Sequence, residues 1–121
     1  MVEELNKVTT LEGISGKKYV FSLWTFEDFD DVKSTFTGGG LYLFTKRHIV
    51  DGQFIHDYIY LGQTEDYYTR YTGHHKEQCL RNNQVNCIGF YSMPNASEVV
   101  RRDAENDLLR RYNFPCNNAN N

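Results

Sequence analysis

The pattern of apolar and polar residues divides the chain into short segments, several of which are typical of strands. Residues 17–26 (KKYVFSLWTF) are rich in β-branched and aromatic side chains and predict a strand. Residues 27–36 begin with acids and repeat their apolar positions at helical spacing, which predicts a short helix. Three glycines at 38–40 end that helix. Residues 1–16 are polar and predict a loose lead-in.

The two strongest strand patterns come next, at residues 41–45 and 55–61. Asp51-Gly52 between them is a strong turn signal. Because the connection is longer than a two-residue loop, we expect a hairpin whose arms extend toward this turn.

The pattern changes at residue 64, where Thr64-Glu65-Asp66 predicts the capped start of a helix that runs to about residue 82. Gly73 weakens the middle of that helix and allows a break there. Residues 85–92 contain the apolar run CIGFY and predict a core strand.

A second long helix is predicted over residues 96–112, opened by the capping-box pattern Asn95-x-x-Glu98. Pro115 follows the helix and stops it, and we expect the asparagine-rich residues 118–121 to form a frayed tail.

This order of elements predicts an α+β fold, a small and mostly antiparallel sheet flanked by helices. Residues 38–117 supply a β-β-α-β-α core, and residues 1–37 add a strand and a helix that pack on it. No linker or internal repeat divides the chain, so we expect one structural domain.

Composition agrees with a sheet-containing core, because nine Tyr and eight Phe among 121 residues are many. No run of eighteen apolar residues exists, and residues 1–10 lack the apolar centre of a secretory signal. The cysteines (Cys79, Cys87 and Cys116) are odd in number and lack Cys-x-x-Cys spacing, so they predict neither a disulfide framework nor a zinc site. We therefore expect a cytoplasmic protein with no membrane association.

The formal net charge of −3 argues against broad, non-specific coating of nucleic acid. It does not exclude a nuclease, because a cleft needs local rather than global positive charge.

Candidate chemistry gathers around two tyrosines that each lie near a glycine. Tyr42 ends Gly40-Leu41-Tyr42 in one strand, and Tyr60 begins Tyr60-Leu61-Gly62 in the next. Further along the chain come the polar residues Arg70, His74, Glu105 and Asn117. Arg70 and His74 are four residues apart and share one helix face. Two phenols, a guanidinium, an imidazole and one carboxylate suit phosphodiester cleavage with a single divalent metal.

These residues, in this order, resemble the GIY-YIG nuclease superfamily, with Leu41 and Leu61 in place of isoleucines. The resemblance covers residues 38–117 and implies the family's β-β-α-β-α fold. It also implies an enzyme, a metal-dependent endonuclease that uses Mg²⁺ or Mn²⁺. The expected partner is nucleic acid, DNA rather than RNA.

The resemblance also implies roles for individual residues. Tyr42 would help to deprotonate the attacking water, although a phenol's pKa near 10 requires nearby positive charge for this. Tyr60 and His74 would organise that water, with His75 as the alternative histidine. Arg70 would stabilise charge on the transition state, because a guanidinium forks onto phosphate oxygens.

Three further residues complete the expected site. Glu105 would be the metal ligand, and one carboxylate suffices because Mg²⁺ keeps several waters. Asn117 would brace the tyrosines or contact substrate, and Lys46 is a weaker candidate for a phosphate contact.

Structural interpretations that involve no catalysis stay open beside these proposed roles. Glu105 could simply pair with Arg101, and Asp103 and Asp107 compete for its role, although they fall on other faces of the helix. The alternative function is a non-catalytic module that binds nucleic acid or protein on the same fold. The sequence leaves the oligomeric state open.

Overall fold

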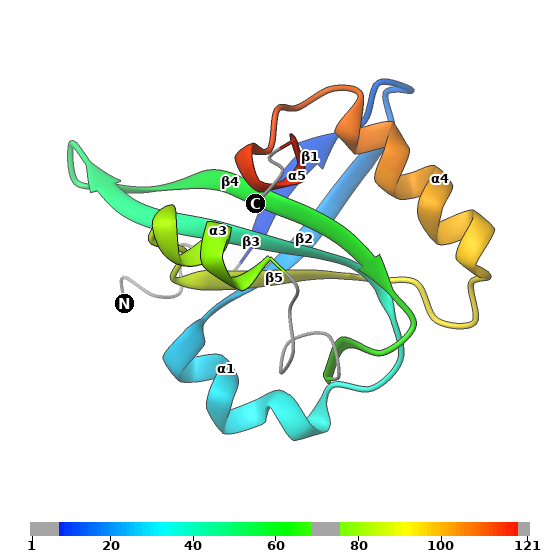
Figure 1. Cartoon of the computed structure of the whole chain (residues 1–121), viewed down its shortest axis with the longest axis horizontal. Coiled ribbons are helices and arrows are strands. Elements are labelled where there is room, and N and C mark those ends of the chain that lie inside the picture. Colours follow the sequence, from blue (N-terminus) through cyan, green and yellow to red (C-terminus); the bar gives the residue numbers. More distant parts are fainter. Residues whose placement is uncertain (1–7, 69–75, 119–121) are drawn as a thin grey trace.

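A computed structural model of the chain describes residues 8–68 and 76–118. Within these residues, antiparallel strands form one sheet in the order β1-β2-β5-β3-β4 (Figure 1). The strands are β1 (Val8–Glu12), β2 (Lys18–Thr25), β3 (Gly40–Val50), β4 (Gln53–Thr64) and β5 (Cys87–Ser92). The helices are α1 (Phe26–Val32), the 3₁₀ turn η2 (Lys33–Thr35), α3 (Glu77–Asn82), α4 (Glu98–Leu109) and α5 (Pro115–Asn118). The predicted α+β class, with an antiparallel sheet and flanking helices, is confirmed.

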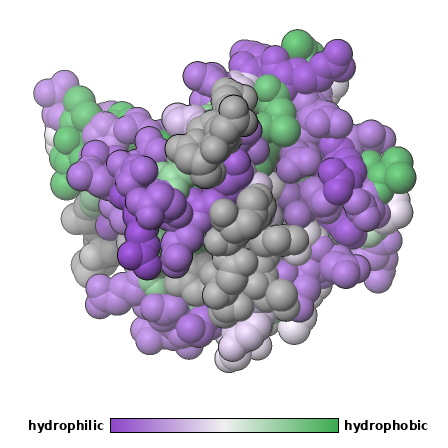
Figure 2. Space-filling model, viewed as in Figure 1, coloured by the Kyte–Doolittle hydropathy of each residue, from purple (hydrophilic) through white to green (hydrophobic). Residues whose placement is uncertain are grey.

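The β3–β4 hairpin has the extended arms that its sequence predicts. Its turn is Asp51-Gly52, and both residues have positive φ angles, 51° and 78°, as a tight hairpin turn requires. The pairing shifts register between Phe44 and Thr45, where β4 carries one extra residue. Beyond this bulge the hairpin projects from the sheet (Figure 1). Figure 2 shows apolar surface over its far end, where Ile49 is 64% exposed.

The N-terminal segment joins the same sheet as the rest of the chain. The expectation of a loose lead-in over residues 1–16 is wrong from residue 8 onward, because β1 pairs with β2 along its whole length. β2 in turn pairs with β5. The alternation of β1 is hard to detect because it is an edge strand, in which Leu11 is the one fully buried residue.

Alternate residues of the sheet build two separate hydrophobic clusters, one on each face. The first cluster lies under α1, α3 and α5 and consists of Phe29, Tyr42, Phe44, Ile59, Tyr60, Tyr67, Cys79, Leu80, Ile88, Phe90 and Cys116. The second lies under α4 and consists of Leu11, Tyr19, Phe21, Leu41, Leu43, Leu61, Ala104, Leu108 and Phe114. Figure 1 shows α1 and α4 on opposite sides of the sheet. The sheet curls around the second cluster, so that Thr9 Oγ1 on β1 lies 2.8 Å from the Tyr58 hydroxyl on β4.

Helix α4 is shorter than predicted and begins at a different cap. The hydroxyl of Ser97 accepts from the backbone N–H of Val100, so the predicted capping box at Asn95 is wrong. Asn95 instead has a left-handed φ of 63° and belongs to the preceding turn. The buried face is formed by Arg101, Ala104 and Leu108, whereas Val100 is 49% exposed.

The prediction that the cysteines form no disulfide is wrong. Cys79 on α3 is bonded to Cys116 on α5, and Cys87 is a buried free thiol. Pro115 opens α5 with its preset φ, in addition to following α4. The cysteines therefore give no support to a reducing compartment, and the cytoplasmic location stays a prediction. None of the helices in the described parts of the chain is long and apolar enough to cross a membrane.

Candidate active site

The two motif tyrosines lie together on one face of the sheet. Tyr42 on β3 and Tyr60 on β4 both belong to the first cluster, and their ring centroids are 5.9 Å apart. They are neighbours because β3 and β4 pair in antiparallel register, with Tyr60 opposite Phe44 and Tyr42 opposite Gly62. Both rings are buried, 3% and 8% exposed. The hairpin therefore brings Tyr42 and Tyr60 into contact, as the sequence-based site requires.

Gly62 makes room for the phenol of Tyr42. A Cβ atom at Gly62 would lie 2.7 Å from Tyr42 Cε1 and would overlap Cζ and the hydroxyl oxygen. The ring of Tyr42 thus lies across the strand, with its hydroxyl end over the backbone of Gly62. Any larger residue at this position would have to displace a buried ring.

Asn117 binds the middle residue of the same motif. Its side-chain Oδ1 accepts from the Leu61 N–H at 2.8 Å, and its Nδ2 donates to the Leu61 carbonyl oxygen at 2.7 Å. These groups point outward because β4 is the edge of the sheet. The amide therefore takes the place of a further strand at this residue, and it fixes the backbone between Tyr60 and Gly62.

Helix α4 carries Glu105 on the face of the sheet opposite to the two tyrosines. The guanidinium of Arg101 donates from Nε to Gln63 Oε1 at 2.9 Å, and the Tyr112 ring packs 5.9 Å from that of Tyr58. These two contacts fix α4 antiparallel to β4, as Figure 1 shows. Glu105 follows Arg101 by one turn, about 6 Å along the helix axis. It therefore lies on the second-cluster side of the sheet, whereas Tyr42 and Tyr60 lie in the first cluster. The structure does not bring Glu105 and the two tyrosines together on one face.

The carboxyl group of Glu105 is partly buried, and this burial raises its pKa, an effect that the charge of Arg102 opposes. Arg101 does not neutralise it in the way the sequence suggested, because its guanidinium bonds Gln63 and the Ala96 carbonyl oxygen. A divalent cation would favour the ionised form and offset this desolvation. The role of Glu105 as a metal ligand stays a prediction. The described residues contain no group of three or more His, Cys, Asp or Glu side chains suited to a metal.

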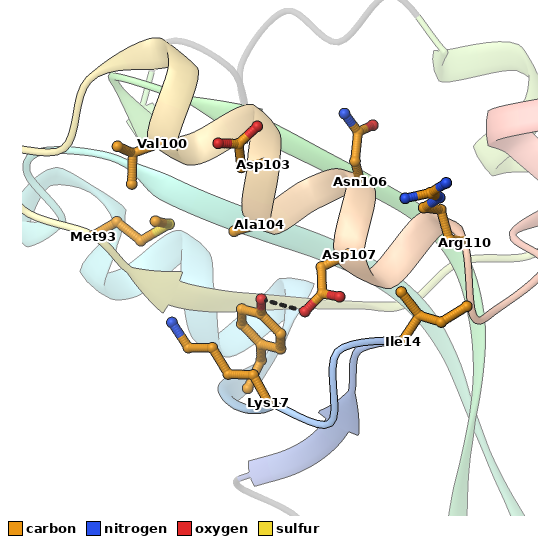
Figure 3. A pocket seen from close by; sticks show the side chains of 10 residues that line it. Ile14, Lys17, Met93, Val100, Asp103, Ala104, Asn106, Asp107 and Arg110 are labelled. Atoms are coloured by element: carbon orange, nitrogen blue, oxygen red, sulfur yellow. Dashed lines mark hydrogen bonds between the residues drawn. The ribbon is translucent and has the colours of Figure 1, made fainter.

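The competing acids of α4 face a different part of the molecule. Asp103 and Asp107 line a groove of about 510 Å³ between α4 and the β1–β2 turn, together with Lys17 and Arg110 (Figure 3). Asp107 is engaged there, because it accepts from the Ser15 N–H at 2.9 Å and from the Ser15 hydroxyl at 2.7 Å. These bonds lower its pKa. Asp107 therefore anchors the β1–β2 turn, and Glu105 is the acid of this helix that faces β4.

Asp107 also forms a hydrogen bond with Tyr19, a member of the second cluster. It accepts from the Tyr19 hydroxyl at 2.8 Å, the bond drawn in Figure 3. Burial and this contact raise the pKa of Tyr19. The α4 helix is thus held on both flanks, by Asp107 on the groove side and by Arg101 on the β4 side.

The remaining predicted residues are placed differently. Lys46 lies beyond the bulge on the hairpin arm, and its Nζ donates to Gln84 Oε1 at 2.9 Å. The structure therefore brings Lys46 next to the loop before β5 and not to the tyrosine pair. Arg70 and His74, together with the alternative His75, lie outside the described residues.

Sequence reasoning missed two contributors to this site. Gln63 follows the Tyr60-Leu61-Gly62 motif directly and receives Arg101, the contact that docks α4. Cys116 directly precedes Asn117, and its disulfide ties that segment to α3. Adjacency in sequence to a motif residue was the available signal in both cases.

Comparisons with known proteins leave the family undetermined. No family model, no curated protein and no solved structure matches this chain.

Proposed function

We propose that this protein is a metal-dependent endonuclease that hydrolyses phosphodiester bonds, with DNA as the expected substrate. One observation carries the proposal. Each residue of Tyr60-Leu61-Gly62 is engaged by another candidate residue or motif partner: Tyr60 by the ring of Tyr42, Leu61 by Asn117, and Gly62 by the Tyr42 hydroxyl end. Two candidate residues, Tyr42 and Asn117, thus contact all three residues of this motif.

In the proposed reaction, water attacks phosphorus in line. Tyr42, in its phenolate form, accepts a proton from that water, and Tyr60 holds the Tyr42 ring in place. Arg70 binds the equatorial phosphate oxygens, where charge develops in the transition state. His74 orients the water through a hydrogen bond. Asn117 keeps the strand that carries Tyr60 in position.

Glu105 is the residue proposed to hold the metal. A divalent cation held by Glu105 would supply Lewis-acid stabilisation of charge on a phosphate, on the face of the sheet opposite to Tyr42 and Tyr60. The partial burial of Glu105 supports this role, since a carboxylate kept at a cost in solvation is typical of functional sites.

Plasmid nicking in the presence of Mg²⁺ or Mn²⁺ tests the proposal. We expect Glu105→Gln and Arg70→Ala each to abolish nicking. Asp103→Asn is the matched control, because Asp103 is an exposed acid on the same helix that lines the groove away from β4. Cleavage retained in both Glu105→Gln and Arg70→Ala would refute the proposal. Parallel DNA and RNA substrates decide which nucleic acid is cut.

The alternative is a non-catalytic module that binds nucleic acid or protein. The burial of both tyrosines favours it, because a 3% exposed phenol offers little surface to a substrate. The net charge of −3 also favours a restricted binding surface. Nucleic-acid binding in a gel-shift assay, without cleavage across Mg²⁺, Mn²⁺ and Ca²⁺, would support this alternative.

A further inference from the structure

The Cys79–Cys116 disulfide lies beside the candidate site and not at a distant position. Both cysteines belong to the first cluster, the same cluster that contains Tyr42 and Tyr60. Cys79 is 2% exposed and Cys116 is fully buried. The bond links α3 to α5, two short helices whose cysteines are 37 residues apart in sequence.

The segment that carries Asn117 has little intrinsic stability of its own. Helix α5 spans four residues, and a single helical turn is far too short to be stable without tertiary anchors. Phe114, the residue directly before this helix, is 1% exposed and packs in the second cluster. Cys116 anchors the middle of the helix in the first cluster. Asn117 is therefore the residue immediately after the last covalent anchor.

A third residue holds the disulfide in place from the α3 side. Asn83, the C-cap of α3, donates from Nδ2 to the Cys79 carbonyl oxygen at 2.9 Å. The same amide nitrogen lies 3.5 Å from the Cys116 sulfur. The end of α3, the disulfide and the start of Asn117 thus form one connected unit.

We propose that the Cys79–Cys116 disulfide is a positioning element of the candidate site. It holds the Asn117 amide against the backbone of Leu61, and so it fixes the strand edge that carries Tyr60 and Gly62. The role in catalysis rests on the proposed nuclease function, whereas the effect on Leu61 does not. Reduction by a dithiol would convert the bond to two thiols, with the dithiol oxidised to a disulfide, and would release Asn117.

Amide hydrogen exchange measured residue by residue tests this inference. We compare the wild type with the Cys79→Ala/Cys116→Ala variant and follow the Leu61 amide, which donates to Asn117. The Arg47 amide is the internal control, because it donates in the same way to Asn86 Oδ1 at 2.7 Å and has no disulfide beside that asparagine. Cys87→Ala is the control for loss of a buried sulfur.

In the disulfide variant, the Leu61 amide hydrogen is expected to exchange at least tenfold faster than in the wild type, while the exchange rate of the Arg47 amide stays unchanged. Asn117→Ala, which keeps the disulfide, should give the same acceleration at Leu61, and combining the changes should add nothing. Unchanged exchange at Leu61, or equal acceleration at Leu61 and Arg47, would overturn the inference. If the alanine variant does not fold, the dithiol-reduced wild type provides the same comparison.

Kinetics then separate this inference from the proposed function. If the wild type cleaves DNA, we expect the disulfide variant to lower kcat with little change in KM, because the Asn117 amide is engaged by the Leu61 backbone through both its oxygen and its nitrogen. If the wild type does not cleave DNA, the nuclease proposal fails, and the exchange at Leu61 still decides whether the disulfide positions this strand.

Discussion

The contact between Gly62 and Tyr42 makes a sharp prediction about Gly62→Ala. The new methyl group would overlap the Tyr42 ring, which is 3% exposed and packed against Phe44 and Tyr60. Overpacking of this kind costs about 1–3 kcal/mol. Removing a glycine also restricts the unfolded chain and contributes about 0.4–1 kcal/mol of stability. The net expectation is a loss of roughly 0.5–2 kcal/mol in the free energy of unfolding.

The sign of this effect should reverse when the ring is shortened. Tyr42→Leu keeps an apolar side chain that ends short of Gly62. In this background the methyl group of Gly62→Ala therefore has no ring to overlap. We expect the alanine to stabilise that background by roughly 0.4–1 kcal/mol, the unfolded-state term alone. Tyr42 and Gly62 should therefore couple by about 1–3 kcal/mol in a double-mutant cycle.

Urea unfolding at equilibrium measures all four proteins of the cycle. Gly89→Ala is the matched control, since this buried strand glycine faces the end of the Leu23 side chain at 2.9 Å and has no contact with Tyr42 among its nearest atoms. Its effect should be the same in both backgrounds. An equal effect of Gly62→Ala with Tyr42 and with Leu at position 42 would refute the proposed packing of the phenol.

Three further predictions concern pH. Burial raises the pKa of Glu105 above its ordinary 4.5, so its ionised form destabilises the fold at neutral pH. Glu105→Gln should therefore raise the melting temperature at pH 7. This gain should vanish by pH 4, where the carboxyl group is protonated. The pKa of Asp107 is lowered, so its hydrogen bonds stabilise the fold above the pKa of the unfolded state, and this stabilisation is lost as pH falls through the folded-state pKa. In Asp107→Asn the melting temperature should therefore depend less on pH below pH 4. Burial, and then Arg47, lowers the pKa of His56 to about 4, so stability should fall between pH 6.5 and 4 by about 1–2 kcal/mol after solvent screening. Urea unfolding of His56→Gln should show no such fall.

The Glu105 prediction has particular value because it is independent of any nuclease assay. A variant that gains stability while losing cleavage would mark a carboxylate retained for function. A lower melting temperature for Glu105→Gln at pH 7 would instead indicate a structural role for this group.

Local patterns predicted the parts of the fold that local chemistry decides. Asp51-Gly52 specifies the hairpin turn through its left-handed φ angles, and the aromatic runs specify β3, β4 and β5. The sequence did not predict strand β1, because this edge strand buries essentially one side chain, that of Leu11. The cap of α4 was misplaced by two residues, since Asn95 and Ser97 both suit that position and only the path of the chain chooses between them.

The candidate site shows the same division. Register in the hairpin is local, and it suffices to bring Tyr42 next to Gly62 and Tyr60. Pairing of Cys79 with Cys116 depends on how two short helices dock after the whole sheet has formed, and no spacing rule predicts it. The placement of Glu105 on the opposite face likewise depends on the Arg101–Gln63 contact, in which neither residue belongs to a motif.

The two asparagine amides have a consequence for association between molecules. A foreign strand can add to an exposed sheet edge only where successive outward N–H and C=O groups are free. Asn117 occupies both groups of Leu61 on β4, and Asn86 occupies both groups of Arg47, where β3 extends beyond β5. Each amide interrupts the hydrogen-bonding edge with one side chain. A foreign strand that approached the edge at Leu61 or at Arg47 would have to displace an asparagine side chain before it could pair there.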